Sequence, residues 1–270
     1  MVGFAPTVMS EGEFRAKLTK MEKLNNDVSK NCTTLFSRCN RAISILPPPL
    51  AQKLNNALNK LNELIKKFFE EIAKIFLNPG WPFGLMSAGN DWTAKVGGPA
   101  TQQAAKINEE QMRIDNHWQG PAAEAYSKVL PSQKDALNAI KTATDAIDSN
   151  LQKTAYGIFG LWAAIVIAVA MFVAELTAET AAAATVVGAP PAAAGAGAST
   201  AKVVGLITAI VAAFVAYVGT LVDSLTSLRQ TLASSAAFPG GKWPKSTTSD
   251  FSDGSISDGD TTDWRIKTND

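Results

Sequence analysis

The residue types that carry out catalysis or bind metal ions are scarce in this chain, and their spacing matches no recognised site. The 270 residues include one histidine, His117, and two cysteines, Cys32 and Cys39. Two cysteines and one distant histidine do not make a zinc site of known spacing. A hydrolytic triad would place His117 beside an activated serine or cysteine, and no nucleophile-elbow motif occurs. The sequence therefore predicts neither a metal centre nor nucleophilic catalysis.

Two other patterns with catalytic potential have simpler explanations. Glu109 and Glu110 are adjacent carboxylates, but we expect them on an ordinary polar helix face. Gly195-Ala196-Gly197 is not followed by the Lys-Ser/Thr pair of a phosphate-binding loop. We therefore expect a non-enzymatic protein with no catalytic residues and no cofactor.

The two cysteines are expected to be buried and unpaired. Cys32 and Cys39 are seven residues apart on a predicted helix, which places them on one face but about 10 Å apart. A disulfide requires Cα atoms closer than about 7 Å, so a straight helix excludes a bond between them. The two cysteines do not indicate whether the protein works in an oxidising or a reducing compartment.

Charge and the N-terminal residues exclude two further classes. The formal net charge is only +1, which argues against a nucleic-acid partner because such proteins carry a strongly basic surface. Residues 1–6 have no basic region followed by an apolar run, so we expect no cleavable general secretory signal there. Export would need another route.

Two charge-free segments, residues 154–174 and 203–222, dominate the rest of the chain. A helix rising about 1.5 Å per residue needs roughly 20 apolar residues to cross a hydrocarbon core of about 30 Å, and both segments have that length. Neither has the polar stripe of a helix on the surface of a soluble domain. They are either membrane helices or fully buried helices of a bundle, and both interpretations remain open.

Residues 10–77 are predicted to form an amphipathic helical hairpin. Ser10 and Glu13 have the spacing of a capping box. Apolar residues then recur in steps of three and four, as in coiled coils, on both sides of Pro47-Pro48-Pro49. Proline lacks the backbone amide that continues a helix, so this triplet separates the two helices.

The next two segments are predicted from their turn residues. Residues 78–98 are rich in Gly, Pro and Trp and are expected to be an irregular connection. Residues 99–153 follow as a second hairpin, with a helix over 99–117 and another from Pro121 that is kinked or briefly broken at Pro131.

The last two segments complete an all-α fold. Residues 154–235 are predicted as an apolar, membrane-type hairpin with an Ala/Gly/Pro-rich loop at 180–201, and residues 236–270 as a disordered tail. The predicted architecture is an elongated antiparallel helical bundle with two long apolar helices.

Trp118-Gln119-Gly120 is the motif that carries most information, because it stands where one predicted helix turns into the next. Glycine lets the chain reverse without a Cβ penalty, and tryptophan can cover the end of the hairpin or contact a partner. Pro121-Ala122-Ala123 follows the motif, and Tyr126 follows in turn. A plain helix–turn–helix corner is the alternative explanation.

This combination resembles the Trp-x-Gly helical-hairpin proteins exported by ESX (type VII) systems of actinobacteria and related Gram-positive bacteria, in particular the larger secretion-associated substrates. The resemblance covers about residues 99–155. It implies secretion, or a place in the cell envelope, without a signal peptide and usually together with another helical-hairpin partner or chaperone. It assigns Trp118 and Gly120 to the turn motif and Tyr126 to a packing position.

The chain departs from that family in two respects. The helix predicted over 99–117 is shorter than the family's first helix, so residues 10–77 must supply extra bundle surface. Such substrates commonly carry a tyrosine followed four positions later by Asp or Glu, whereas Tyr126, Tyr156 and Tyr217 are followed there by Leu, Gly and Leu. The partner would then have to supply this signal, or the protein is not exported.

Three functional hypotheses follow. The first is a type VII-associated secreted effector or structural component that forms homo-oligomers or contacts a membrane through residues 154–235. The second is a resident membrane protein with two spans and a cytoplasmic helical scaffold. The third is a soluble helical interaction protein whose charge-free segments form its core.

Overall fold

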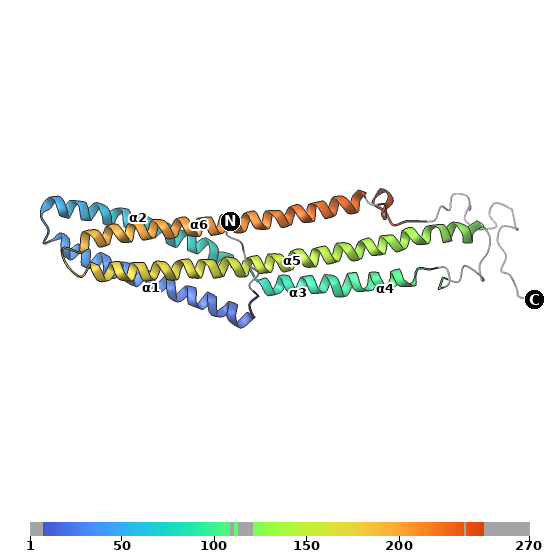
Figure 1. The fold of residues 1–270 in the computed structure, drawn as a ribbon, viewed down its shortest axis with the longest axis horizontal. Coiled ribbons are helices and arrows are strands. Elements are labelled where there is room, and N and C mark those ends of the chain that lie inside the picture. The colour runs from blue at the N-terminus through green and yellow to red at the C-terminus, as the bar shows by residue number, and fades with distance from the viewer. Residues whose placement is uncertain (1–7, 109–110, 113–120, 235, 246–270) are drawn as a thin grey trace, which may run out of the picture. The chain divides into compact units, whose positions relative to one another are not determined.

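The computed structural model describes residues 8–108, 111–112, 121–234 and 236–245. The described residues form helices joined by short connections, and no strand occurs among them, which confirms the all-α class. Most of the predicted tail at 236–270 lies outside these residues. The helices in chain order are α1 (Glu11–Ile43), α2 (Pro48–Leu77), α3 (Pro82–Trp92), a π-helical turn (Thr93–Gly97), α4 (Gly98–Lys106), α5 (Pro121–Ala182), α6 (Ala189–Ser234) and a 3-10 turn (Pro239–Gly241) (Figure 1).

The chain divides into two compact units. The first comprises Met1–Met86 and Leu151–Val222, and the second comprises Ser87–Asn150 and Asp223–Asp270. The first unit therefore combines the N-terminal amphipathic hairpin with the apolar hairpin, although the two are far apart in the sequence.

The N-terminal hairpin forms as its sequence pattern predicts. The Glu13 amide donates to Ser10 Oγ at 3.3 Å and the Ser10 amide donates to Glu13 Oε2 at 2.7 Å, which confirms the capping box. Pro48 starts α2 in the first helical turn, where its missing amide is not needed. The buried seams of the two helices are Phe14, Met21, Leu24, Val28, Cys32, Leu35, Cys39 and Ala42 in α1, and Leu54, Leu58, Leu61, Ile65, Phe68 and Ile72 in α2.

One continuous hydrophobic core joins these seams to α5 and α6 in the first unit. Ring contacts show how the helices meet: Phe14 lies 5.7 Å from Phe159, and Phe68 lies 5.3 Å from Phe172, measured between centroids. The N-terminal hairpin thus packs on the first charge-free segment.

The expectation of an irregular connection over 78–98 is wrong for most of its length. Only Asn78–Trp81 is non-helical, and α3 with its π-helical turn continues to Gly97. Phe83, Leu85 and Met86 pack against the core of the first unit, and this burial outweighs the low helix propensity of the glycines. Gly80 supports the turn with φ of 72°, a conformation that glycine adopts without strain.

The helix expected over 99–117 is shorter, because α4 ends at Lys106. The Asn108 carboxamide oxygen accepts from the Gln111 amide at 2.7 Å, a local bond that competes with helix formation. The helix from Pro121 is confirmed, and it runs through Pro131 without interruption into the charge-free segment.

The loop expected at 180–201 is also much shorter. Residues 183–188 alone connect α5 to α6, which begins at Ala189. Pro190 and Pro191 fall in the first turn of α6, where proline is tolerated, and the alanines that follow have the highest helix propensity. The Gly188 amide donates to Thr185 Oγ1 at 3.0 Å and helps to close this connection.

In the second unit, two glycines allow α3 and the π-helical turn to approach α5 closely. A Cβ atom at Gly89 would lie 2.3 Å from Asp148 Oδ1, and one at Gly97 would lie 2.4 Å from Thr144 Oγ1. Thr93 Oγ1 donates to Asp148 Oδ2 at 3.2 Å beside them. Buried Thr144 satisfies its own hydroxyl by donating to the Lys141 carbonyl at 2.7 Å.

Candidate functional site: the apolar hairpin

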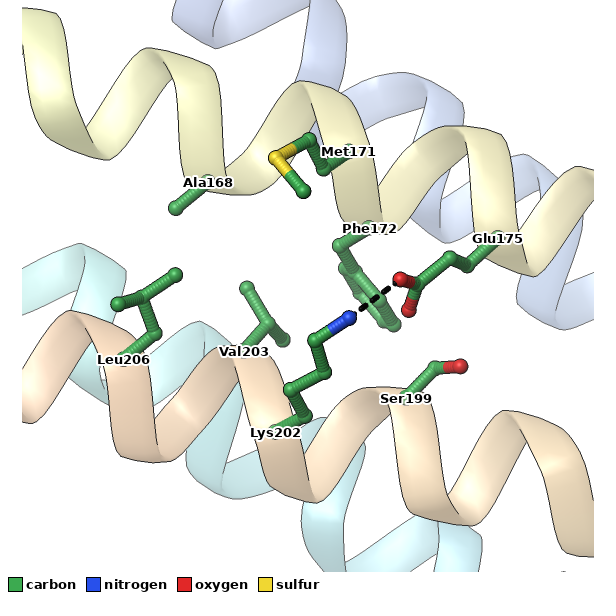
Figure 2. A pocket seen from close by; sticks show the side chains of 8 residues that line it. All are labelled: Ala168, Met171, Phe172, Glu175, Ser199, Lys202, Val203 and Leu206. Carbon is green, nitrogen blue, oxygen red and sulfur yellow. Dashed lines mark hydrogen bonds and ion pairs between the residues drawn. The ribbon is translucent and has the colours of Figure 1, made fainter.

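The two charge-free segments lie side by side in α5 and α6, and one ion pair marks their common end. Lys202 Nζ lies 2.6 Å from Glu175 Oε1, so the first charge after residue 174 meets the last charge before residue 203 (Figure 2). From this ion pair α5 and α6 run antiparallel to each other, and both helices are free of charged residues over the two segments.

The contacts near the other end of the segments show the same register. The Tyr217 hydroxyl donates to the Lys153 carbonyl at 3.0 Å, just before the first charge-free segment begins. A Cβ atom at Gly157 would lie 2.7 Å from the Tyr217 ring and 3.2 Å from the Phe214 ring. Both segments therefore occupy one band about 30 Å long, given a rise of about 1.5 Å per residue.

The first segment is largely a core helix. In the most apolar stretch of α5, 61% of the residues are buried. One stripe of this helix is at most 1% exposed and packs in the core that includes α1 and α2: Phe159, Trp162, Ile165, Val169, Phe172 and Leu176. This burial in a protein core is what the third hypothesis requires of the first charge-free segment.

The second segment differs, because only 22% of the residues in the most apolar stretch of α6 are buried. We call the uncovered surface of this stretch the exposed face of α6. It has small residues along its middle and larger apolar residues at its edges. Val215 is 63% exposed, Val222 55% and Leu206 42%. The small members are Gly205, Ala209, Ala212, Ala216 and Gly219.

A shallow apolar groove runs between α5 and α6 beside this face. Ala168 and Met171 of α5 line one side of it, and Val203 and Leu206 of α6 line the other (Figure 2). The Glu175–Lys202 pair and Ser199 close its polar end. The groove thus continues the exposed apolar surface of α6 onto α5.

Three threonine hydroxyls of the hairpin donate to carbonyls of their own helices. Thr180 Oγ1 donates to the Leu176 carbonyl at 2.7 Å, and buried Thr200 does the same with Ala196 at 2.6 Å. The exposed Thr208 donates to Val204 at 2.9 Å. These threonines need no water to satisfy their donors, a requirement for any helix in an apolar environment.

Two carboxylates beyond the charge-free segments have shifted pKa values of opposite sign. The hydrogen bond from Lys202, with a further one from Ser199, lowers the pKa of Glu175 below its usual value. Partial burial, with the charge of Glu175, raises the pKa of Glu179. Gly195 makes room for Glu179, because a Cβ atom there would lie 2.2 Å from its Oε1.

The residues predicted from the Trp-x-Gly motif are not part of this hairpin site. Trp118 and Gly120 lie outside the described residues. Tyr126 is half-buried in the first turns of α5, in the second unit, where it packs against Ala123 and Leu130 together with Ile107.

Metal-binding and nucleophilic side chains do not converge in the part of the chain that the structure describes. No group of three or more His, Cys, Asp or Glu residues there could hold a metal ion, and His117 lies outside it. Cys32 and Cys39 are buried and free, as expected. Burial raises the pKa of the Cys32 thiol to about 11 and also raises that of Cys39, so neither is an activated nucleophile.

Sequence reasoning missed the pairing of Glu175 with Lys202. The signal was present, because these residues are the charges that border the two segments at one end. Their contact across 27 positions depends on the antiparallel packing of α5 on α6, which the sequence pattern did not specify.

No protein-family model, curated protein or solved structure matches this chain. The fold and the site define the class: an all-α protein whose α5 and α6 are each long and apolar enough to cross a membrane.

Proposed function

We propose that this protein is a non-enzymatic helical protein that acts at a membrane, which it contacts through the apolar hairpin of α5 and α6. The observation that carries the proposal is the exposed face of α6, which has no charged residue between Lys202 and Asp223. A large apolar surface of this kind is costly in water and marks a contact with lipid or with another protein.

Lipid is the favoured occupant because of length and register. The charge-free bands of both helices span about 30 Å, the thickness of a hydrocarbon core. The Glu175–Lys202 pair stands at one border of that band, where charged side chains reach the headgroup region.

A type VII export route forms the second part of the proposal. We propose that the chain leaves the cell as a secretion-associated protein together with a second helical hairpin. Helix α5 begins at Pro121, directly after Trp118-Gln119-Gly120, which supports a helix on the C-terminal side of the motif. The resemblance to ESX substrates supports the export route, and the apolar hairpin supports a membrane as the place where the protein acts.

Flotation with lipid vesicles tests the membrane contact. The full chain is mixed with phosphatidylcholine/phosphatidylglycerol vesicles and centrifuged through a density gradient. Val215→Asp adds a charge to the exposed face and is expected to weaken vesicle partition at least tenfold, because an aspartate in a bilayer costs about 3 kcal/mol.

Asn59→Asp is the matched control, since it adds the same charge to an exposed position of α2. It should float as the unmodified chain does. Equal flotation of both variants, or no flotation of the unmodified chain, would contradict the proposed membrane contact.

Export is tested by expressing the full chain in an actinobacterial host with and without a functional ESX system. We expect the protein in the culture supernatant or cell envelope only in the first strain. Trp118→Ala should reduce the exported fraction severalfold, whereas Trp92→Ala, which changes a tryptophan outside the motif, should not. Equal export from both strains contradicts the type VII route.

A soluble interaction protein is the second candidate, because most of the first charge-free segment is buried in the bundle. Washing native membranes with alkaline carbonate separates the two functions. Complete release of the protein without detergent favours the soluble function, and retention favours the membrane contact.

A further inference from the structure

We infer that the buried stripe of α5 is a second, concealed lipid-binding surface, and that the α1–α2 hairpin is a hinged cover over it. The inference rests on the proposed membrane contact, since the exposed face of α6 brings the protein to the bilayer. The covered stripe comprises Phe159, Trp162, Ile165, Val169, Phe172 and Leu176.

The stripe lies on the membrane-length segment itself, and α1 and α2 cover it. Phe14 of α1 contacts Phe159, while Phe76 of α2 lies 5.2 Å from Trp162 between ring centroids. Phe68 reaches Phe172 further along α5. Removing α1 and α2 from these contacts would leave an α5 segment that is apolar around its whole circumference.

The cover has its own chain connection at one end. Asn78–Trp81 links α2 to α3, and Gly80 in this link has positive φ. Trp162 Nε1 donates to the Pro79 carbonyl at 2.8 Å, which ties the link to α5. A rotation about this link can lift the cover while the link stays attached.

Few polar contacts hold the opposite end of the cover. Asn31 Nδ2 lies 3.2 Å from Thr177 Oγ1, and the Arg38 guanidinium donates to the Thr180 carbonyl. Thr177 and Thr180 also donate to carbonyls of α5 itself, at 2.7 Å each. Their hydroxyl donors therefore remain satisfied when α1 moves away.

The hairpin beneath is suited to lipid without its cover. Its threonines bond within their helices, and Glu175 with Lys202 stands at the border of the charge-free band. The cover, in contrast, has charged outer faces, which keep α1 and α2 on the aqueous side of the membrane once they are lifted.

The chain contains its own reporters for this movement. Its two cysteines, Cys32 and Cys39, lie in the α1 seam, 6% and 0% exposed. We expect a membrane-impermeant maleimide to label them slowly in buffer. Binding of the full chain to phosphatidylcholine/phosphatidylglycerol vesicles should raise the labelling rate at least tenfold, toward the rate in denaturant.

An unchanged labelling rate in protein that floats with the vesicles overturns the inference but leaves the proposed membrane contact intact. Absence of flotation contradicts both. The two failures are therefore distinguishable in one sample.

A cross-link provides the second measurement. Asn31→Cys and Thr177→Cys, in a chain with Cys32→Ala and Cys39→Ala, are joined by a short cleavable bis-maleimide. The locked protein should float through α6 yet be released by alkaline carbonate, and the same protein after cleavage of the linker should resist carbonate. Equal carbonate resistance of the locked and cleaved forms overturns the inference.

Discussion

At the scale of single residues, glycines in the apolar hairpin differ in what surrounds them. Gly157 faces the rings of Tyr217 and Phe214, whereas a Cβ atom at Gly205 meets nothing within 4 Å. The same residue type therefore serves close helix packing at one position and lies on an open surface at the other.

Gly157→Ala is expected to destabilise the first unit by about 1–3 kcal/mol, because rigid rings must move to admit the methyl group. Gly205→Ala on the exposed face should stabilise it by up to about 1 kcal/mol through helix propensity. Chemical denaturation followed by circular dichroism measures both. Similar effects of the two substitutions would refute the close packing of α5 on α6 at Gly157.

Glu179 gives a pH-dependent prediction at the same scale. Its folded pKa is raised above the ordinary value of 4.5, so its protonation stabilises the folded state, and this stability is lost as the pH rises through the folded pKa. Glu179→Gln should therefore be more stable than the unmodified chain at pH 7, and the difference should shrink as the pH falls toward 4.5.

Glu175 is the matched control with the opposite sign. Its lowered folded pKa contributes stability that is present above 4.5 and lost as the pH falls through the folded value. Glu175→Gln should be less stable at neutral pH. Thermal unfolding of the unmodified chain and of the two variants between pH 4 and 8 measures both stability differences. At pH 7 the differences caused by Glu179→Gln and Glu175→Gln should have opposite signs.

At the scale of elements, α2 packs aromatic side chains of the cover on α5. Phe68 is fully buried and contacts both Phe69 and Phe172. Leu77, at the end of the same helix, is 78% exposed. Substitutions at these two positions distinguish the loss of core packing from the loss of an exposed apolar side chain on α2.

Phe68→Ala is expected to cost about 3–5 kcal/mol, because it removes a fully buried ring and leaves a cavity. Leu77→Ala should change the stability by less than about 0.5 kcal/mol. Phe68→Ala should also increase thiol labelling of Cys32 in buffer, since the cover then opens more often. Stability unaffected by Phe68→Ala would contradict the packing of α2 on α5.

At the scale of the whole molecule, an exposed charge-free helix face governs solution behaviour. We expect the purified full chain to form oligomers in buffer that a mild detergent disperses to monomers, because detergent covers the face of α6. Light scattering coupled to size-exclusion chromatography measures this. Val215→Asp should shift the distribution toward monomer in buffer, and a detergent-independent monomer of the unmodified chain would count against an uncovered face.

The local pattern of the sequence is sufficient to predict the helical hairpin of α1 and α2. Apolar residues recur in threes and fours, and Ser10 with Glu13 caps the first helix, so each helix specifies its own buried side. The turn at Pro47–Pro49 follows from the missing amides of proline. These features depend on neighbours in the chain and can be seen without a tertiary structure.

Other local predictions failed where packing outweighed propensity. Residues 82–97 became helical because Phe83, Leu85 and Met86 pack on the core. Residues 189–201 became helical because Pro190 and Pro191 fall in the first turn of α6. Turn-forming residue types indicate where a helix can stop, but burial and position within the turn decide whether it does.

From its own pattern, the sequence determined that two bilayer-length apolar helices exist, and that catalytic and metal-binding residue types are scarce. Only the tertiary structure decided that α5 is covered while α6 is left open, and that Glu175 meets Lys202. The physical reason is that a helix apolar on every side has no periodic stripe to mark its buried face. Its environment is therefore set by the helices that pack against it, α1 and α2, which are distant from it in the chain: Phe76 of α2, for example, contacts Trp162 of α5.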